Sequence, residues 1–207
     1  IPLRLVGSEM CIRDRKLNAD IIFADQQKKH NYSSDLKGSY QYKNIQTALC
    51  AIKEIQKSNW SISEESIISG LLKVEINTGF IGRWTELNHS PLTICDTAHN
   101  EEGLTIVLKD VQSLDYSKLH FIIGFVEDKD LSSIIDLFPK DASYYFCKPN
   151  IARGLDVLIL KEMFESKLRF GNSYSSVPKA YEAAKNNADK KDLIYIGGST
   201  FVVSEII

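Results

Sequence analysis

The sequence predicts an α/β fold in which a mostly parallel sheet is flanked by helices in the Rossmann-like manner. From about residue 80 onward, short apolar runs of strand length alternate with stretches that repeat apolar residues every three or four positions. The runs are almost continuously hydrophobic, which is typical of strands buried on both faces. This alternation indicates βαβ units and therefore a doubly wound domain.

The expected strands are, in order, Leu92–Cys95, Leu119–Gly124, Tyr144–Cys147 and Leu193–Ile196. Helical stripes separate them, and the first consists of Leu104, Val107, Leu108 and Val111. A shorter stripe ends before Pro139 and consists of Leu131, Ile134, Ile135 and Phe138. The next two are Val157, Leu160, Met163 and Phe164, then Tyr181, Ala184 and Ala188 in a helix opened by Pro178.

The region before residue 80 is predicted to be mainly helical. One apolar face begins near Asn44 and contains Ile45, Ala48, Leu49, Ile52 and Ile55. Ser61 and Glu64 have the spacing of a capping box before a second helix, and Asn77-Thr78-Gly79 ends the region. Ile21–Ala24 has the length and apolarity of a short strand.

Composition excludes several classes of protein. The 207 residues carry 25 Lys+Arg against 27 Asp+Glu, and a net charge of −2 argues against a nucleic-acid-binding protein, which is usually strongly basic. No apolar run approaches the roughly 18 residues of a membrane helix. A hydrophobic content of 43% supports a real core, so a disordered chain is not expected.

The four cysteines, Cys11, Cys50, Cys95 and Cys147, are scattered and have no partner at zinc-ligand spacing. We expect reduced thiols in a cytoplasmic protein. Residues 1–15 match no downstream pattern, and charged residues interrupt any signal-peptide core. The string Leu5–Arg15 resembles translated sequencing-adapter sequence, so we expect a non-native leader there; an ordinary terminus is the alternative.

The loop Asp96-Thr97-Ala98-His99-Asn100 is the first candidate site, because ligands bind open parallel sheets beyond the carboxyl ends of strands. Asp96 could accept hydrogen bonds from ribose hydroxyls, and His99 could donate to a phosphate. Asn100 could cap the following helix. The spacing fits equally well with Asp96 and Asn100 being only turn and cap residues.

Two further segments could meet an anion. Gly197-Gly198-Ser199-Thr200 follows a strand and opens a helix, but it lacks the Walker lysine, which favours a simple turn. Arg83, at the junction of the two regions, could hold a phosphate bidentately or be a solvated linker charge. From these residues alone, the prediction is an α/β domain of the nucleotide-binding kind.

A series of motifs resembles the folylpolyglutamate synthase/dihydrofolate synthase family of the Mur ligase superfamily, with details most like Bacteroidetes enzymes. They run from about residue 18 to the end: Gly38–Ile45 with Ala48, Gly70-Leu71, Gly82-Arg83-Trp84, Cys95–Asn100, Lys129-Asp130, Arg153-Gly154-Leu155 and Gly197-Gly198-Ser199. The resemblance implies that residues 16–79 end a P-loop ATPase domain and that residues 80–207 form the Mur ligase-type C-terminal domain.

The resemblance also implies that ATP binds in the cleft between these two domains. Asn44 would contact the adenine, Arg83 the phosphates and Asp96 the ribose, with His99 beside the nucleotide. Arg83 and His99 are the candidates for a catalytic role. The implied reaction joins L-glutamate to dihydropteroate or a folate, through an acyl phosphate, while ATP becomes ADP. The implied partners are these small molecules and Mg²⁺, with neither nucleic acid nor membrane; the oligomeric state stays open.

The sequence also departs from the family. It contains no Gly-x-x-Gly-Lys-Ser loop, so the P-loop, magnesium ligands and folate pocket would lie upstream of residue 16. Thr97 replaces a frequent Gly, and Gly154 replaces a frequent Ala. We therefore expect a fragment that does not catalyse ligation by itself. The alternatives are a fragment of a peptidoglycan Mur ligase, whose loop tends to read Tyr-Ala-His-x-Pro, and a non-catalytic nucleotide-binding module.

Overall fold

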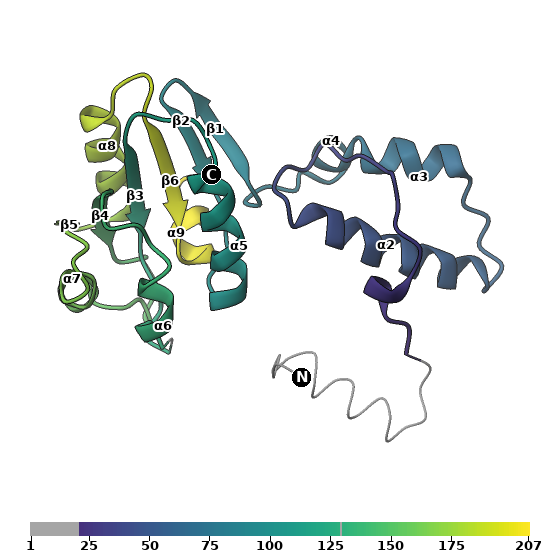
Figure 1. Cartoon of the computed structure of the whole chain (residues 1–207), viewed down its shortest axis with the longest axis horizontal. Coiled ribbons are helices and arrows are strands. Elements are labelled where there is room, and N and C mark those ends of the chain that lie inside the picture. The colour runs from purple at the N-terminus through teal and green to yellow at the C-terminus, as the bar shows by residue number, and fades with distance from the viewer. Residues whose placement is uncertain (1–20, 129) are drawn as a thin grey trace. The chain divides into compact units, whose positions relative to one another are not determined.

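The computed structural model describes residues 21–128 and 130–207 (Figure 1). The leader expected at residues 1–15, Cys11 and Lys129 lie outside this part of the chain. Of the described residues, 21–33 and 41–71 form one compact unit, which we call the helical unit. Residues 34–40, 72–128 and 130–207 form the second, which we call the sheet unit.

The helical unit is built on α2 (Gln41–Gln56) and α3 (Glu64–Leu71). Helix α2 begins before Asn44 and buries Ile45 and Leu49, whereas Ala48 and Ile55 of the expected apolar face are exposed. Ser63 caps α3, because its Oγ accepts a hydrogen bond from the Ser66 N–H at 3.2 Å. The capping box expected from Ser61 is therefore displaced by two residues.

The strand expected at Ile21–Ala24 does not form. The 3₁₀ helix η1 (Ala24–Gln26) lies there instead. A lone apolar run cannot become a strand without a neighbour to take its backbone hydrogen bonds, and none of the described residues of this unit forms one.

The sheet unit contains six strands in the order β1-β2-β6-β3-β4-β5. Their bounds are Thr85–His89, Leu92–Cys95, Leu193–Gly197, Leu119–Ile123, Ser143–Cys147 and Gly171–Tyr174 in that spatial order. All neighbouring pairs are parallel except β1 with β2. The predicted mostly parallel sheet flanked by helices is confirmed.

Strands β1 and β5 were not expected from the sequence. They lie at the two edges of the sheet and are only partly buried. Polar residues such as Glu86 and Asn172 are tolerated where one side of a strand faces water. An edge strand of this kind produces no continuous apolar run.

Helices cover both faces of the sheet (Figure 1). The described helices of the sheet unit are α4 (Val74–Thr78), α5 (Glu101–Gln112), α6 (Ser132–Ile135), α7 (Val157–Glu165), α8 (Val177–Asn187) and α9 (Thr200–Ser204). Side chains of α5, α6 and α7 share one core, whereas those of α8 and α9 share a second. The central strand β3 contributes side chains to both cores, Phe121 and Ile123 to the first and Ile122 to the second.

Helix ends in the sheet unit follow the sequence closely. Asn100 caps α5, accepting a hydrogen bond from the Gly103 N–H at 2.8 Å, so its predicted capping role is confirmed. Ser176 caps α8 ahead of Pro178. Gly79 ends α4 in the left-handed conformation, with φ of 65°, as expected from Asn77-Thr78-Gly79.

Candidate functional site

The order of the strands defines where a ligand would enter the sheet unit. The chain passes from β2 to β3, β4 and β5, and then returns to place β6 between β2 and β3. After β3 it continues toward α6 of the first core, and after β6 toward α9 of the second. The loops therefore diverge between β3 and β6, and this reversal opens a crevice beyond the carboxyl ends of the strands.

A hollow of about 320 Å³ lies at this crevice, and we call it the sheet hollow. Its wall comes from the loops that follow β2, β3, β4 and β6. The residues that line it are His99, Val126, Asp128, Arg153, Gly198, Ser199, Thr200 and Phe201. The sheet hollow thus combines one guanidinium, one imidazole and one carboxylate with two hydroxyl side chains.

Arg153 supplies the positive charge of the sheet hollow. Its guanidinium carbon lies 5.4 Å from the centre of the Phe201 ring, and its Nη1 lies 3.5 Å from Asp128 Oδ2. Backbone hydrogen bonds hold the surrounding loops together, from Glu127 N–H to Arg153 O and from Leu155 N–H to Phe125 O. Because the Asp128 pair is long and solvent-exposed, Arg153 remains accessible to an anionic ligand.

His99 is exposed at the edge of the same hollow, and one of its nitrogens is already committed. Nδ1 lies 3.0 Å from the Thr97 carbonyl oxygen, which can only accept, so Nδ1 must carry a proton and donate. Nε2 is therefore the acceptor of a neutral imidazole. It can donate to a phosphate only when His99 is protonated.

Gly198 and Ser199 shape the floor of the hollow. Gly198 has a φ of 88°, and a Cβ there would lie 2.8 Å from the Gly124 carbonyl oxygen, so only glycine fits. The Ser199 hydroxyl caps α9 by accepting from the Phe201 N–H at 3.2 Å. The segment Gly197–Thr200 is therefore a tight strand-to-helix turn, as the missing Walker lysine favoured.

Asp96 lies next to this site but not in the hollow. Its side chain is completely buried, and Oδ2 accepts hydrogen bonds from the Tyr40 hydroxyl at 2.6 Å and the Trp84 N–H at 2.9 Å. Oδ1 accepts from the Ala98 N–H at 2.8 Å and lies 3.9 Å from Arg83 Nη1. Oδ1 thus accepts only one hydrogen bond from these groups and keeps a second acceptor site.

Three of the four residues predicted for the nucleotide belong to the sheet unit. His99 lines the sheet hollow, while Arg83 and Asp96 lie together beside it. Asn44 belongs to the helical unit, where its exposed amide donates to Gln41 Oε1 at 2.8 Å.

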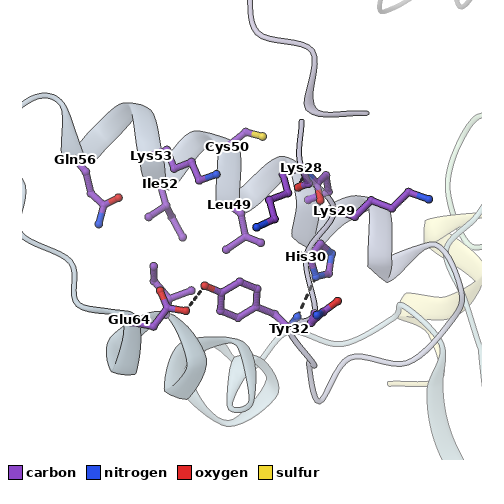
Figure 2. A pocket seen from close by; sticks show the side chains of 13 residues that line it. Lys28, Lys29, His30, Tyr32, Leu49, Cys50, Ile52, Lys53, Gln56 and Glu64 are labelled. Carbon is purple, nitrogen blue, oxygen red and sulfur yellow. Dashed lines mark hydrogen bonds between the residues drawn. The ribbon is translucent and has the colours of Figure 1, made fainter. Parts of the chain in front are cut away.

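The helical unit has a hollow of its own, of about 370 Å³, lined by residues 28–32, α2 and the first turn of α3 (Figure 2). The Lys28 and Lys53 side chains approach it from two sides, and Leu49 and Ile52 supply apolar surface. The polar groups at its edge are largely paired, since the Tyr32 hydroxyl donates to Glu64 and His30 uses both ring nitrogens. None of the four predicted site residues lines it.

Metal, thiol and membrane chemistry find little support among the described residues. They contain no group of three or more His, Cys, Asp or Glu side chains that could hold a metal ion, so Mg²⁺ does not fit this part of the chain. Burial, with the neighbouring Asp96 charge, raises the pKa of the Cys95 thiol to about 12 and makes it a poor nucleophile. None of their helices is long and apolar enough to cross a bilayer.

The profile of the family "Mur ligase, glutamate ligase domain" matches residues 82–200, more than half of the chain. The chain belongs to the Mur ligase family. The matched segment contains the Asp96 loop and every residue that lines the sheet hollow except Phe201. The predicted membership of the superfamily, through its C-terminal half, is confirmed.

The relatives that this chain matches include folylpolyglutamate synthases. The chain is 30% identical over 174 residues to the Haloferax volcanii "Probable bifunctional folylpolyglutamate synthase/dihydropteroate synthase", an alignment that covers 82% of this chain and 20% of that protein. It is 25% identical to E. coli FolC, solved in complex with DHPP and ADP, with a TM-score of 0.67 over 79% of this chain and 37% of that one.

A folylpolyglutamate synthase from Mycobacterium tuberculosis shares the fold over 95% of this chain and 51% of its own, with a TM-score of 0.76 at 16% identity. The Mur ligase chain thus spans between a fifth and a half of the length of these relatives.

Arg153 and Tyr40 are the site residues that spacing did not single out. Arg153 lies in the loop that follows β4, so the rule that selected the loop after β2 applies to this loop as well. Tyr40 could not be found by that rule, because it precedes α2 and reaches Asp96 only through the fold, 56 positions along the chain.

Proposed function

We propose that this chain is part of an ATP-dependent ligase that joins L-glutamate to dihydropteroate or to a folate through an acyl phosphate. The observation that carries the proposal is the Mur ligase match over residues 82–200. The folate relatives support the substrate class, and the ADP bound to E. coli FolC supports the nucleotide. A soluble cytoplasmic setting is part of this proposal.

Four residues would act on the nucleotide, and among them Asp96 would bind the ribose, as the family resemblance implies. Asn44 would contact the adenine, as the motif implies, and Arg83 would neutralise charge on the transferring phosphate. Arg83 suits that task because its side chain is 43% exposed and can therefore reach a ligand. His99 would lie beside the phosphates, donating from Nε2 in its protonated form.

The sheet hollow would take the incoming amino acid. Arg153 offers an exposed guanidinium to a carboxylate, and a guanidinium can bind a carboxylate bidentately. No step of this proposal runs through a metal ion held by the described residues, since these residues offer no ligand set.

Amino-acid binding to the purified chain tests the proposal. We expect L-glutamate to bind, observed by NMR titration, and L-glutamine to bind more weakly because it has one carboxylate fewer. Arg153→Gln should weaken L-glutamate binding by about tenfold and close the gap to L-glutamine. Lys179→Gln, which removes an exposed charge from α8, is the matched control and should change neither.

The proposal fails if L-glutamate does not bind at any accessible concentration, or if Arg153→Gln and Lys179→Gln behave alike. A separate assay with ATP, Mg²⁺, dihydropteroate and L-glutamate tests the expectation that the 207 residues do not ligate alone. Steady release of ADP coupled to glutamate would contradict that expectation while leaving the proposed reaction intact.

A further inference from the structure

The loop that presents Arg83 has left-handed backbone on both sides of the arginine, and it is strained at Trp84. Gly82 has a φ of 94°, and Trp84 has a φ of 50°, a conformation that a bulky residue rarely adopts. Left-handed backbone at a residue of this size persists only where surrounding contacts impose it. The loop is therefore held in place by its neighbours.

Hydrogen bonds with Asp96, Thr97 and Thr85 hold this loop. The Trp84 N–H donates to Asp96 Oδ2, and the Thr97 N–H donates to the Gly82 carbonyl oxygen at 2.9 Å. The Gly82 N–H in turn donates to Thr85 Oγ1 at 2.9 Å. Arg83, between these fixed points, has its backbone set while its guanidinium stays exposed.

Tyr40 completes the arrangement from a different part of the sequence. Its ring packs against the first core, and Gly38 leaves room for it, since a Cβ there would lie 2.8 Å from Tyr40 Cε1. Ser39 fixes the same segment through its N–H, which donates to Asp110 Oδ2 at 2.8 Å. Burial and the Asp96 charge raise the pKa of the Tyr40 hydroxyl, so it remains a donor.

We propose that Tyr40 is a positioning residue for Arg83 and acts through Asp96. We define the Asp96 cluster as Tyr40, Trp84, Asp96 and Ala98. This cluster holds the strained loop, and with it the backbone of Arg83, in one conformation before a phosphate binds. Asp96 holds the loop from beneath, because its Oδ2 accepts from both the Tyr40 hydroxyl and the Trp84 N–H. This inference rests on the proposed contact between Arg83 and phosphate.

The decisive variant is Tyr40→Phe, because it removes one hydroxyl and keeps the packed ring. Trp84 reports on the loop directly. The chain has two tryptophans, so Trp60→Phe leaves Trp84 as the only one, and its emission can be excited selectively over that of the tyrosines. Trp84 is 7% exposed and Trp60 is 68% exposed, so Trp60→Phe removes the emission of the solvent-exposed tryptophan. We expect Tyr40→Phe to increase acrylamide quenching of Trp84 about threefold. Tyr181→Phe on α8 is the control and should leave quenching unchanged.

The second readout is ADP affinity in a double-mutant cycle. Tyr40→Phe should weaken ADP binding about three- to tenfold, and Arg83→Gln should weaken it at least as much. If Tyr40 acts through Arg83, adding Tyr40→Phe to Arg83→Gln should weaken ADP binding no further. A residue with a merely structural role would produce additive losses.

Each outcome has a definite consequence. Unchanged Trp84 quenching in Tyr40→Phe, or additive losses in the cycle, would overturn the inference. If the wild-type chain does not bind ADP, the proposed nucleotide role of Arg83 falls. Trp84 quenching would then still decide whether Tyr40 holds the loop, so the two failures remain distinguishable.

Discussion

His120 Nε2 lies 3.0 Å from Asp192 Oδ2 inside the sheet unit, at the opposite end of the strands from the sheet hollow. His120 is fully buried, and Asp192 is 4% exposed. His120 Nδ1 lies 3.1 Å from the Tyr145 hydroxyl, which also accepts from the Asn187 amide at 3.2 Å. This network joins β3, β4, the end of α8 and the residue before β6.

The network makes the free energy of unfolding depend on pH in the acid range. Burial alone would raise the pKa of Asp192, but hydrogen bonds from the Asp189 N–H and from His120 outweigh it and hold the pKa below the usual value. Because the pKa of Asp192 in the folded protein lies below its usual value of 3.8, ionised Asp192 stabilises the fold at pH values above 3.8. That stabilisation is lost as the pH falls through the folded-state pKa.

Asp192→Asn should therefore lower the free energy of unfolding by about 2 kcal/mol near neutral pH. Urea denaturation across a pH series should show that this gap, the difference in free energy of unfolding between the wild type and Asp192→Asn, narrows once the pH falls below the usual carboxyl range. Asp128→Asn, at a site 61% exposed, is the control and should show almost no gap. A gap that widens in acid would contradict the assignment.

Tyr195→Phe should stabilise the protein. The Tyr195 hydroxyl is buried and has no hydrogen-bond partner among the described residues. Removing an unpaired buried hydroxyl should raise the free energy of unfolding by about 1 kcal/mol. Tyr144→Phe, which removes a buried hydroxyl that donates to the Pro139 carbonyl oxygen, should lower it by a similar amount. Equal losses in both variants, measured by urea denaturation, would disprove the prediction.

Gly198→Ala should be strongly destabilising, because the residue combines a φ of 88° with a backbone oxygen 2.8 Å from the new Cβ. We expect a loss of about 3 kcal/mol and weaker L-glutamate binding. Gly70→Ala is the opposite case, because Gly70 lies in α3 with nothing within 4 Å of its Cβ position. It should stabilise the helical unit by about 0.5 kcal/mol. Thermal unfolding of the two variants checks both signs.

The thiols should differ widely in reactivity. Burial raises the pKa of Cys95 to about 12 and also raises that of Cys147, whereas Cys50 is partly exposed. At mildly alkaline pH, iodoacetamide should modify Cys50 at least about a hundredfold faster than the two buried thiols. Peptide mass spectrometry should detect Cys95 and Cys147 adducts only after denaturation. Rapid modification of Cys147 in the native protein would count against the described core.

The sequence determined the centre of the sheet unit. Strands β2, β3, β4 and β6 are short apolar runs because they are buried on both faces, so hydrophobicity alone located them. The Asn100 cap and the start of a helix at Pro178 were also predicted, since both depend on residues close together in the sequence. The edge strands β1 and β5 escaped because half-solvated strands carry polar residues.

The loop after β2 was also predicted as a site from the sequence, but the roles within it were not decided there. The tertiary structure placed His99 on the sheet hollow and buried Asp96 beneath the Arg83 loop. It brought Tyr40 to Asp96 across 56 positions and Arg153 to Phe201 across the sheet. Periodicity reports which way a side chain faces along one element, whereas a hydrogen bond between distant segments exists only once the strands have been ordered.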